Sequence, residues 1–292
     1  MADIKRVNFH VGAEVVVGDL HLPLGEGPFP AVITGGPMTS VKEQVTGTYA
    51  RALASHGIAA LAIDHRHYGE SGEEPRQYEY YPDKIADLKA SLKFLADQPD
   101  IDKTRLGAVG VCLGNGYLAH AVSGEPDVRG FVAIAGYYRD VRAMKEADPD
   151  GFEAKVAEGR EARELYEKTG EIKAIPAVAL DRDAAMTLQS TYDYYAGRAA
   201  HPNYENRFAV MSREHFLQFD VQSAAVNLRM PFKMIHGPNA LSPAWADKFY
   251  NAVPATKERA TLQSQGQTGI YDDPAIVNIA TSLAVDFLKR VL

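Results

Sequence analysis

The sequence contains a single cysteine, so no disulfide can form within the chain, as is common for proteins of a reducing compartment. It also lacks a cluster of lysines and arginines, and its formal net charge of -7 argues against binding to nucleic acid or to an anionic membrane. No apolar run is long enough to cross a bilayer, and the first six residues alternate in polarity, unlike a signal peptide. We therefore expect a cytoplasmic protein without membrane or nucleic-acid partners.

The apolar residues that are present predict an α/β protein. The chain has 292 residues, 46% hydrophobic and 24% charged, which suits one large domain with an insertion. Residues 4–10 and 13–22 alternate in polarity and predict an antiparallel hairpin. Continuous apolar runs are typical of buried parallel strands. Such runs, each predicting one strand, lie at about 29–34, 58–63, 105–109, 128–136 and 230–237, and the last strand is expected over 258–263.

Helical spacing of apolar residues separates these strands. Helices are predicted over about 42–56, 79–97 and 243–253, and from Asp273-Pro274 to the end of the chain. In the last of them a buried stripe is expected at Ile276, Ile279, Leu283, Phe287 and Val291. Between 141 and 215 the composition becomes more charged and no strand of the sheet is evident, so this segment is expected to be an insertion.

The candidate active site is the turn Gly110-Val111-Cys112-Leu113-Gly114, which lies between a predicted strand and a predicted helix. Strand, Gly-x-Cys-x-Gly and helix is the context of a nucleophile elbow, with cysteine in place of serine. The tight turn leaves no room for side chains at the flanking glycines. We expect the helix N-terminus to favour the thiolate of Cys112. The alternative is a glycine-rich turn around an inert buried cysteine.

With this motif the chain resembles the α/β-hydrolase superfamily, and in particular its dienelactone-hydrolase-like, Cys-elbow branch. The resemblance implies a mostly parallel twisted sheet flanked by helices, the α/β-hydrolase fold. It implies a core made of residues 1–140 and 216–292, and a helical cap, residues 141–215, that closes over Cys112. It also implies an oxyanion hole made by the amides of Met38 and Leu113, with Thr39 as the alternative to Met38, because Pro37 has no N–H.

The chain departs from this superfamily where the catalytic base should be. Related Cys-elbow hydrolases carry Thr-His-x-Asp-x-Tyr-Asp where this chain has residues 266–272, and without gaps Gln267 takes the histidine position. No histidine follows His236. At the acid position the chain has Asn239, which carries no charge, and Asp140 is the nearest substitute by topology. His236, His65, His67 and His215 remain as candidates for a relocated base.

Several polar and aromatic side chains are expected near the substrate, because they follow strands at the edge where parallel sheets bind ligands or lie in the insertion. They are Thr39, His67, Tyr137, Tyr138, Tyr192, Tyr195 and Asn239. The alternative roles are helix packing for the insertion's tyrosines and loop structuring for His67. Asp64 and Arg66 are expected to pair beside the pocket. No ligand set of metal spacing is evident, so no metal and no cofactor are expected.

Three functions remain open from the sequence. The first is a non-hydrolytic enzyme that carries out a cyclisation, isomerisation, C–C lyase or acyl-transfer step on a small carbonyl compound, since a thiol can attack without the missing base but water cannot. The second is a Cys-dependent hydrolase of an ester, thioester or lactone with a relocated base. The third is a protein that binds a small ligand without catalysis. The expected partner is a small-molecule substrate, and a homodimer is left open.

Overall fold

The predicted hairpin forms one edge of the main sheet in the structure, a computed structural model that describes residues 3–292. β1 (Asp3–Val11) pairs antiparallel with β2 (Glu14–Leu22), and β2 pairs antiparallel with β4 (Ala59–Ile63). From β4 onward all neighbours are parallel. The other strands are β3 (Phe29–Gly35), β5 (Ile101–Val111), β6 (Val128–Ile134), β9 (Phe232–His236) and β10 (Lys257–Thr261).

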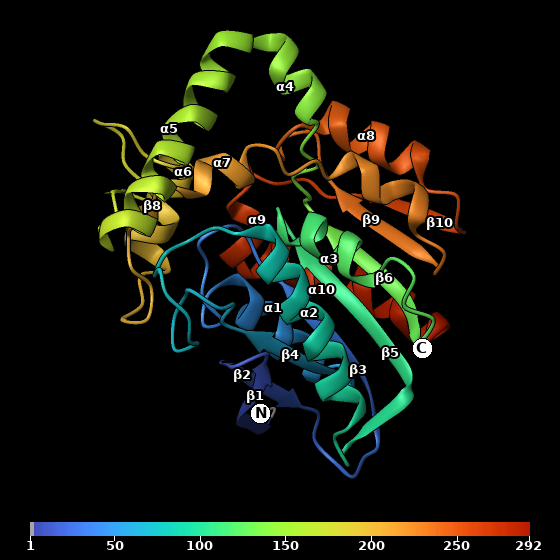
Figure 1. Cartoon of the computed structure of the whole chain (residues 1–292). Coiled ribbons are helices and arrows are strands. Elements are labelled where there is room, and N and C mark those ends of the chain that lie inside the picture. Colours follow the sequence, from blue (N-terminus) through green and yellow to red (C-terminus); the bar gives the residue numbers. More distant parts are fainter. Residues whose placement is uncertain (1–2) are drawn as a thin grey trace.

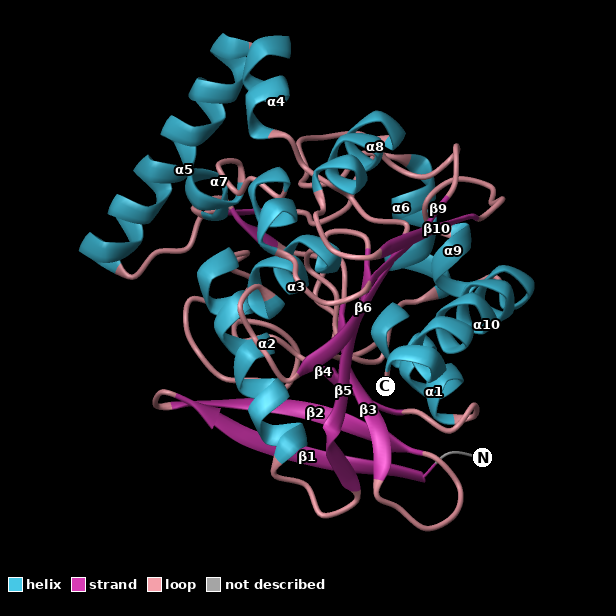
Figure 2. Ribbon diagram, turned by 90° about the vertical axis from the view of Figure 1, so that its right-hand side faces the viewer, coloured by secondary structure: helices cyan, strands magenta, loops and turns pink. Residues whose placement is uncertain are grey.

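The eight strands have the order β1-β2-β4-β3-β5-β6-β9-β10, and helices cover both faces of the sheet. Figure 2 shows α2 (Tyr81–Ala96) and α3 (Gly114–Val122) on one face, with α1 (Val45–Ala54) and α10 (Pro274–Val291) on the other. α8 (Pro243–Ala252) precedes β10, and the short α9 (Gly269–Asp272) leads into α10. The predicted α/β class and mostly parallel sheet are confirmed.

Residues 141–215 contribute no strand to the main sheet. They contain α4 (Val141–Ala147), α5 (Pro149–Thr169), β7 (Ala174–Ile175), α6 (Gln189–Tyr192), the π-helical turn η1 (Asp193–Arg198), β8 (Phe208–Ala209) and α7 (Ser212–Phe216). β7 and β8 pair only with each other. α4 and α5 form an arch far from the amino-terminal hairpin (Figure 1). The expected boundary at 215 falls inside α7, and a 3₁₀ helix η2 (Gln222–Asn227) leads back toward the core.

The buried face of α10 agrees with the expected stripe except at Ile279, since Phe287 is buried and Ile276, Leu283 and Val291 pack against the core. Ile279 is 54% exposed, whereas Ala280 and Ala284 are fully buried. A Cβ added at Gly130 of β6 would lie 2.6 Å from a methyl group of Val291, so this helix packs very close to the sheet. Such a close approach favours small side chains on the inner face and turns Ile279 outward. Among residues 3–292, no helix is both long enough and apolar enough to cross a bilayer.

Candidate active site

Cys112 lies in a strained turn between β5 and α3. Its φ of 56° is in the left-handed region, which non-glycine residues rarely adopt, and its amide donates to the carbonyl of Ile134 over 3.2 Å. A Cβ at Gly110 would lie 2.4 Å from Asn115 Oδ1, and one at Gly114 would lie 2.2 Å from the carbonyl oxygen of Gly35. Both glycines are therefore required by close packing, and the backbone has the form expected of a nucleophile elbow.

Cys112 is buried, and it lines a cavity of about 390 Å³ at the carboxyl end of the sheet. The wall is mostly apolar and aromatic, with a few hydroxyl groups, as is usual for small-molecule sites. It consists of Pro37, Met38, Cys112, Leu113, Tyr137, Arg139, Met144, Ala185, Met186, Thr187, Leu188, Thr191, Tyr195, Phe216, Leu217, Leu241, Ser242, Trp245, Gln267 and Tyr271. Residues from 141–215 thus close one side of the cavity, opposite the turn that carries Cys112.

Met38 and Leu113 both line this cavity, and within residues 3–292 neither amide donates to an oxygen of the protein. Their loops are in direct contact, because the Gly114 position abuts the backbone of Gly35 and Gly36. These two amides are thus available to stabilise a negative oxygen. The amide of Thr39 is not, because it donates to Glu79 Oε2 over 2.9 Å.

Glu79 joins the Met38 loop to α3. Its buried carboxylate accepts hydrogen bonds from Tyr68 Oη at 2.7 Å and Tyr117 Oη at 2.6 Å, in addition to the Thr39 amide. Lys84 Nζ lies 2.7 Å from Oε1. Burial raises the pKa of Glu79, but attraction to Lys84 and the hydrogen bonds outweigh burial and hold it below its ordinary value. The ionised carboxylate therefore holds the loop at a fixed distance from the helix.

Gln267 lines the cavity beside Cys112, and its side-chain amide is fully used. Nε2 donates to the carbonyl of Ala135 over 2.7 Å and to Tyr271 Oη over 3.3 Å, and Oε1 accepts from the amide of Leu241 over 3.0 Å. An amide cannot accept a proton at neutral pH. This network fixes Gln267 in place and gives the site no base.

The thiol of Cys112 is not activated as the sequence led us to expect. Burial raises the pKa of Cys112 above its ordinary value, although hydrogen bonds with Tyr271, the Leu113 amide and Gln267 act in the opposite direction. Burial likewise raises the pKa of Tyr271, which therefore remains a neutral hydroxyl. The expectation that the helix N-terminus would dominate is wrong, because removal of water from the thiolate has the larger effect.

The expected substitutes for the acid and the base lie elsewhere. Asp140 caps α4 by accepting from the Ala143 amide over 3.2 Å, and it forms an ion pair with Lys248. His236 is buried at the end of β9, where Nε2 lies 3.2 Å from the carbonyl oxygen of Gly136. Burial lowers the pKa of His236, so it is a neutral core residue. Neither side chain lines the cavity.

The other candidate histidines are also engaged outside the cavity. His65 Nδ1 lies 3.2 Å from Asp87, and the His215 ring packs edge-on against Tyr80. His67 bridges the carbonyl of Pro75 and the carboxylate of Asp83, each at 3.0 Å. These contacts give His67 the loop-structuring role that the sequence left open as the alternative. Among residues 3–292, the cavity wall contains no histidine and no carboxylate.

Of the residues expected around the substrate, Tyr137 and Tyr195 line the cavity. Tyr137 stacks on Trp245 with ring centres 6.1 Å apart, and Tyr195 stacks on Tyr204 at 5.3 Å. The other residues expected around the substrate do not line the cavity, because they pack or form hydrogen bonds elsewhere. Tyr138 packs in the core against Phe249, and Tyr192 is 38% exposed. Asn239 is exposed and donates to the Ser264 carbonyl over 3.0 Å.

The expected pair of Asp64 and Arg66 does not form. Asp64 binds Lys42 Nζ at 2.7 Å, and Arg66 binds Asp87 at 2.6 Å.

The side-chain ligand atoms of His67, Glu73 and Asp83 come within 4.8 Å of one another, a grouping that their sequence spacing did not suggest. Arg66 lies 3.0 Å from Glu73 and 3.1 Å from Asp83, so a guanidinium already neutralises both carboxylates and leaves little reason for a metal ion there.

Three of the cavity residues that sequence reasoning missed are polar or aromatic and touch the site's chemistry or its aromatic wall. Tyr271 is hydrogen-bonded to Cys112 and Gln267, Trp245 stacks on Tyr137, and Arg139 supplies a cation. Arg139 directly follows Tyr137-Tyr138 at the end of β6, so its position at the ligand-binding edge was a usable signal. Trp245 lies on α8, and nothing in its local pattern shows that this helix borders the cavity.

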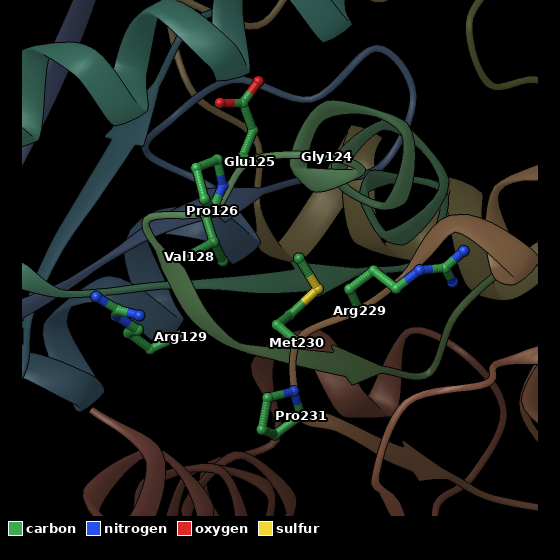
Figure 3. A pocket seen from close by; sticks show the side chains of 8 residues that line it. All are labelled: Gly124, Glu125, Pro126, Val128, Arg129, Arg229, Met230 and Pro231. Carbon is green, nitrogen blue, oxygen red and sulfur yellow. The ribbon is translucent and has the colours of Figure 1, made fainter.

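A second hollow lies at the opposite, amino end of β6 and β9, lined by Gly124, Glu125, Pro126, Val128, Arg129, Arg229, Met230 and Pro231 (Figure 3). Its volume of about 430 Å³ is slightly larger than that of the Cys112 cavity. The charged ends of Glu125, Arg129 and Arg229 point away from one another, and no nucleophile lines it (Figure 3). We therefore place the candidate active site at Cys112.

The chain is similar to esterases in sequence. Residues 2–141 match the family described as Esterase FrsA-like. The uncharacterized protein YcjY of Escherichia coli strain K12 is 29% identical over 90% of this chain and 89% of its own length. The thiohydrolase aneE of Aspergillus aculeatus is 33% identical over 48% of this chain and 44% of its own length.

Solved structures show the same fold over the whole chain. The hypothetical protein PA2218 of Pseudomonas aeruginosa has a TM-score of 0.84 and 23% identity, covering 100% of this chain and 94% of that one. DcsB, solved in complex with its substrate analogue, has a TM-score of 0.84 and 16% identity, with 99% of each chain covered. A dienelactone hydrolase from Anabaena variabilis has a TM-score of 0.61. The chain therefore has the fold of the α/β-hydrolases.

Proposed function

We propose that this protein is an acyl-transfer enzyme in which Cys112 takes an acyl group from an ester or thioester and passes it to an acceptor bound in the cavity. One observation carries the proposal: within residues 3–292, the wall around Cys112 contains a nucleophile and two amides that donate to no protein oxygen, but no histidine or carboxylate. Such a site has the parts for attack on a carbonyl and lacks the part that activates water.

In the first step the sulfur of Cys112 attacks the carbonyl carbon of the substrate. The amides of Met38 and Leu113 hold the oxygen while it carries negative charge. The bond from carbon to the leaving oxygen or sulfur then breaks, and the proton of the thiol leaves with the departing group. Tyr271, hydrogen-bonded to the sulfur, is placed to pass that proton. The product is a thioester on Cys112.

In the second step a hydroxyl, amine or thiol group of the acceptor attacks this thioester. The S–C bond breaks, and the proton of the acceptor returns to the sulfur of Cys112. A well-oriented acceptor gains an effective concentration of roughly 10⁵ to 10⁸ M, which offsets the missing base. Where the acceptor is part of the same molecule, the product is a ring. Water has no such advantage, and loss of a triad histidine costs roughly 10⁶ in rate in a serine protease.

The similarity to esterases and to a thiohydrolase supports chemistry on esters and thioesters. It also favours a second candidate, a Cys112-dependent hydrolase in which another group activates water. The two candidates differ in the fate of the acyl-enzyme. The transferase accumulates it in the absence of an acceptor, and the hydrolase does not.

The test is the reaction with p-nitrophenyl acetate. We expect a burst of about one equivalent of p-nitrophenol, an acetyl group on the Cys112 peptide by mass spectrometry, and little turnover afterwards. Gln267→His should raise steady turnover, because an imidazole there could orient against the carbonyl of Ala135 and take a proton from water. Brisk turnover in the unaltered protein that is lost in Cys112→Ala would support the hydrolase. The absence of any burst would show that Cys112 is not acylated and would contradict its proposed role as the nucleophile.

A further inference from the structure

Arg139 is a buried cation whose charge no carboxylate of the protein balances. The residue is 2% exposed, and its guanidinium borders the cavity that contains Cys112. Only Nη2 donates a hydrogen bond, to the carbonyl of Leu217 over 3.0 Å, and Nε has no acceptor. Within residues 3–292, no carboxylate oxygen lies within 4.0 Å of it.

The nearest carboxylates have other partners. Glu79 is held by Lys84 and three hydrogen bonds, and Asp220 accepts from the amides of Val141 and Ser223. Aromatic rings offset part of the cost, since the guanidinium carbon lies 4.3 Å from the centre of the Phe216 ring and 5.9 Å from that of Tyr137. A buried charge without a counter-ion is still unfavourable, so the binding of an anion beside Arg139 would stabilise the cavity.

We propose that the substrate carries a carboxylate that Arg139 binds while the acyl carbonyl lies against Cys112. Arg139 follows β6 and Cys112 follows β5, and these strands are neighbours, so both groups face one cavity. Arg139 is the only cation among the residues that line it in the described part of the chain. A single positive charge matches a singly charged carboxylate, and the fork of N–H donors fits its two oxygens. The substrate is therefore the ester or thioester of a small dicarboxylic acid, an inference that rests on the proposed function.

The test compares acylation of Cys112 by mono-p-nitrophenyl adipate, which has a free carboxylate, with acylation by p-nitrophenyl hexanoate, which has the same chain length and no charge. A charge-assisted hydrogen bond predicts a rate roughly 10- to 100-fold higher for the adipate ester. Arg139→Met should bring the ratio of the two rates to about one, and Arg139→Lys should keep part of the preference. Arg142→Met, which removes a cation from the exposed face of α4, is the matched control and should keep the full ratio.

Binding is measured separately, by the protection of Cys112 from iodoacetamide. Free adipate should protect the unaltered protein, and adipamide, its uncharged diamide, should not, a comparison that needs no variant to fold. Equal acylation by both esters together with equal protection by adipate and adipamide would overturn the carboxylate site while leaving acyl transfer in place. Failure of both esters to acylate Cys112, together with protection by adipate alone, would overturn the proposed function and keep the carboxylate site.

Discussion

Cys112 is surrounded by groups that hold the thiol in place but do not ionise it. Its neighbours Gln267 and Tyr271 are neutral, and the only cation of the cavity wall in residues 3–292 is Arg139. Nucleophilic cysteines of low pKa usually lie beside a histidine or a metal. Such an environment agrees with the proposed acyl transfer, in which the acyl-enzyme on Cys112 is stable until its acceptor binds.

This environment makes a prediction about pH. Only the thiolate reacts with iodoacetamide, and burial raises the pKa of Cys112, so the thiolate fraction at pH 7 is lower than in an unfolded chain. The labelling rate of the native protein should therefore still be rising above about pH 8.5, the ordinary pKa of a cysteine, whereas that of urea-unfolded protein should level off near it. Tyr271→Phe removes a hydrogen bond to the thiolate and should move the native profile higher. An inflection below that of the unfolded protein would contradict this account.

Residue pairs were the least predictable part of the site. Asp64 and Arg66 lie two positions apart on one loop, but their partners Lys42 and Asp87 come from elsewhere in the chain. The spacing of residues within one loop cannot show which charged side chain from a distant part of the sequence will pair with them. The unpaired state of Arg139 was hidden for the same reason, because the lack of a partner is a property of the whole fold. The position of Gln267 in the cavity wall was predictable, since it followed from a count of residues along one segment.

At the scale of elements, the contact between β3 and α3 fixes the distance between the amides of Met38 and Leu113. Gly114 is the first residue of α3, and it packs against the last residue of β3, Gly35. On the far side of the same loop, Glu79 binds both the Thr39 amide and Tyr117 of α3. The loop of Met38 is thus held at two points, and the site is built into the scaffold rather than onto a mobile loop.

Gly114→Ala should therefore disturb both stability and chemistry. The added Cβ would lie 2.2 Å from the Gly35 oxygen and 2.6 Å from the Gly36 nitrogen, which are backbone atoms that move only if β3 shifts. We expect a loss of about 1–3 kcal/mol in the free energy of unfolding in urea, together with slower acylation of Cys112. Gly197→Ala, where nothing lies within 4 Å of the new Cβ, is the control and should change stability by less than about 0.5 kcal/mol. Equal stability of the two variants would refute the packing argument.

The elements themselves were largely predictable. Strands showed as short apolar runs, the hairpin as alternation and the Cys112 turn as glycines between a strand and a helix, because each signal is local. In α10, Phe287 and Val291 of the expected stripe face Gly130, but Ile279 is 54% exposed, because helical spacing does not show which residue of each turn lies innermost. Residues 141–215 gave no strand signal for the main sheet, and the part they play in the cavity could not be read from their sequence.

At the scale of the whole molecule, the cavity lies between the sheet and residues 141–215. The part of this segment near η1 is tied to the core, because Arg198 binds Asp272 at 2.7 Å and Gln44 donates to the carbonyl of Ala199 over 3.0 Å. Within the arch, α5 is tied to α7 by the ion pairs of Arg160 and Arg163 with Glu214 and of Glu158 with Arg213, and it buries Phe152, Val156 and Ala162. α4 buries no residue, so it is the part of the cavity wall that can open at the lowest cost.

Limited proteolysis can test this difference. The side chain of Arg142 on α4 is 85% exposed and that of Lys93 on α2 is 80% exposed, so access alone does not distinguish them. α4 has no buried residue, whereas α2 buries Leu88, Leu92 and Leu95. Because trypsin cuts chains that have unfolded locally, we expect the first cuts at Arg142 or Lys145, well before any at Lys93.

Acylation of Cys112 should then slow cleavage of the arch, since Met144 of α4 lines the cavity and a bound acyl group gives it a partner. Cleavage at sites outside residues 141–215 should not change, which separates a local effect from general stabilisation. The measurement is the time course of fragments by mass spectrometry, with and without prior treatment by p-nitrophenyl hexanoate. First cuts in α2, or equal rates for free and acylated protein, would show that α4 does not move as a cover for the cavity.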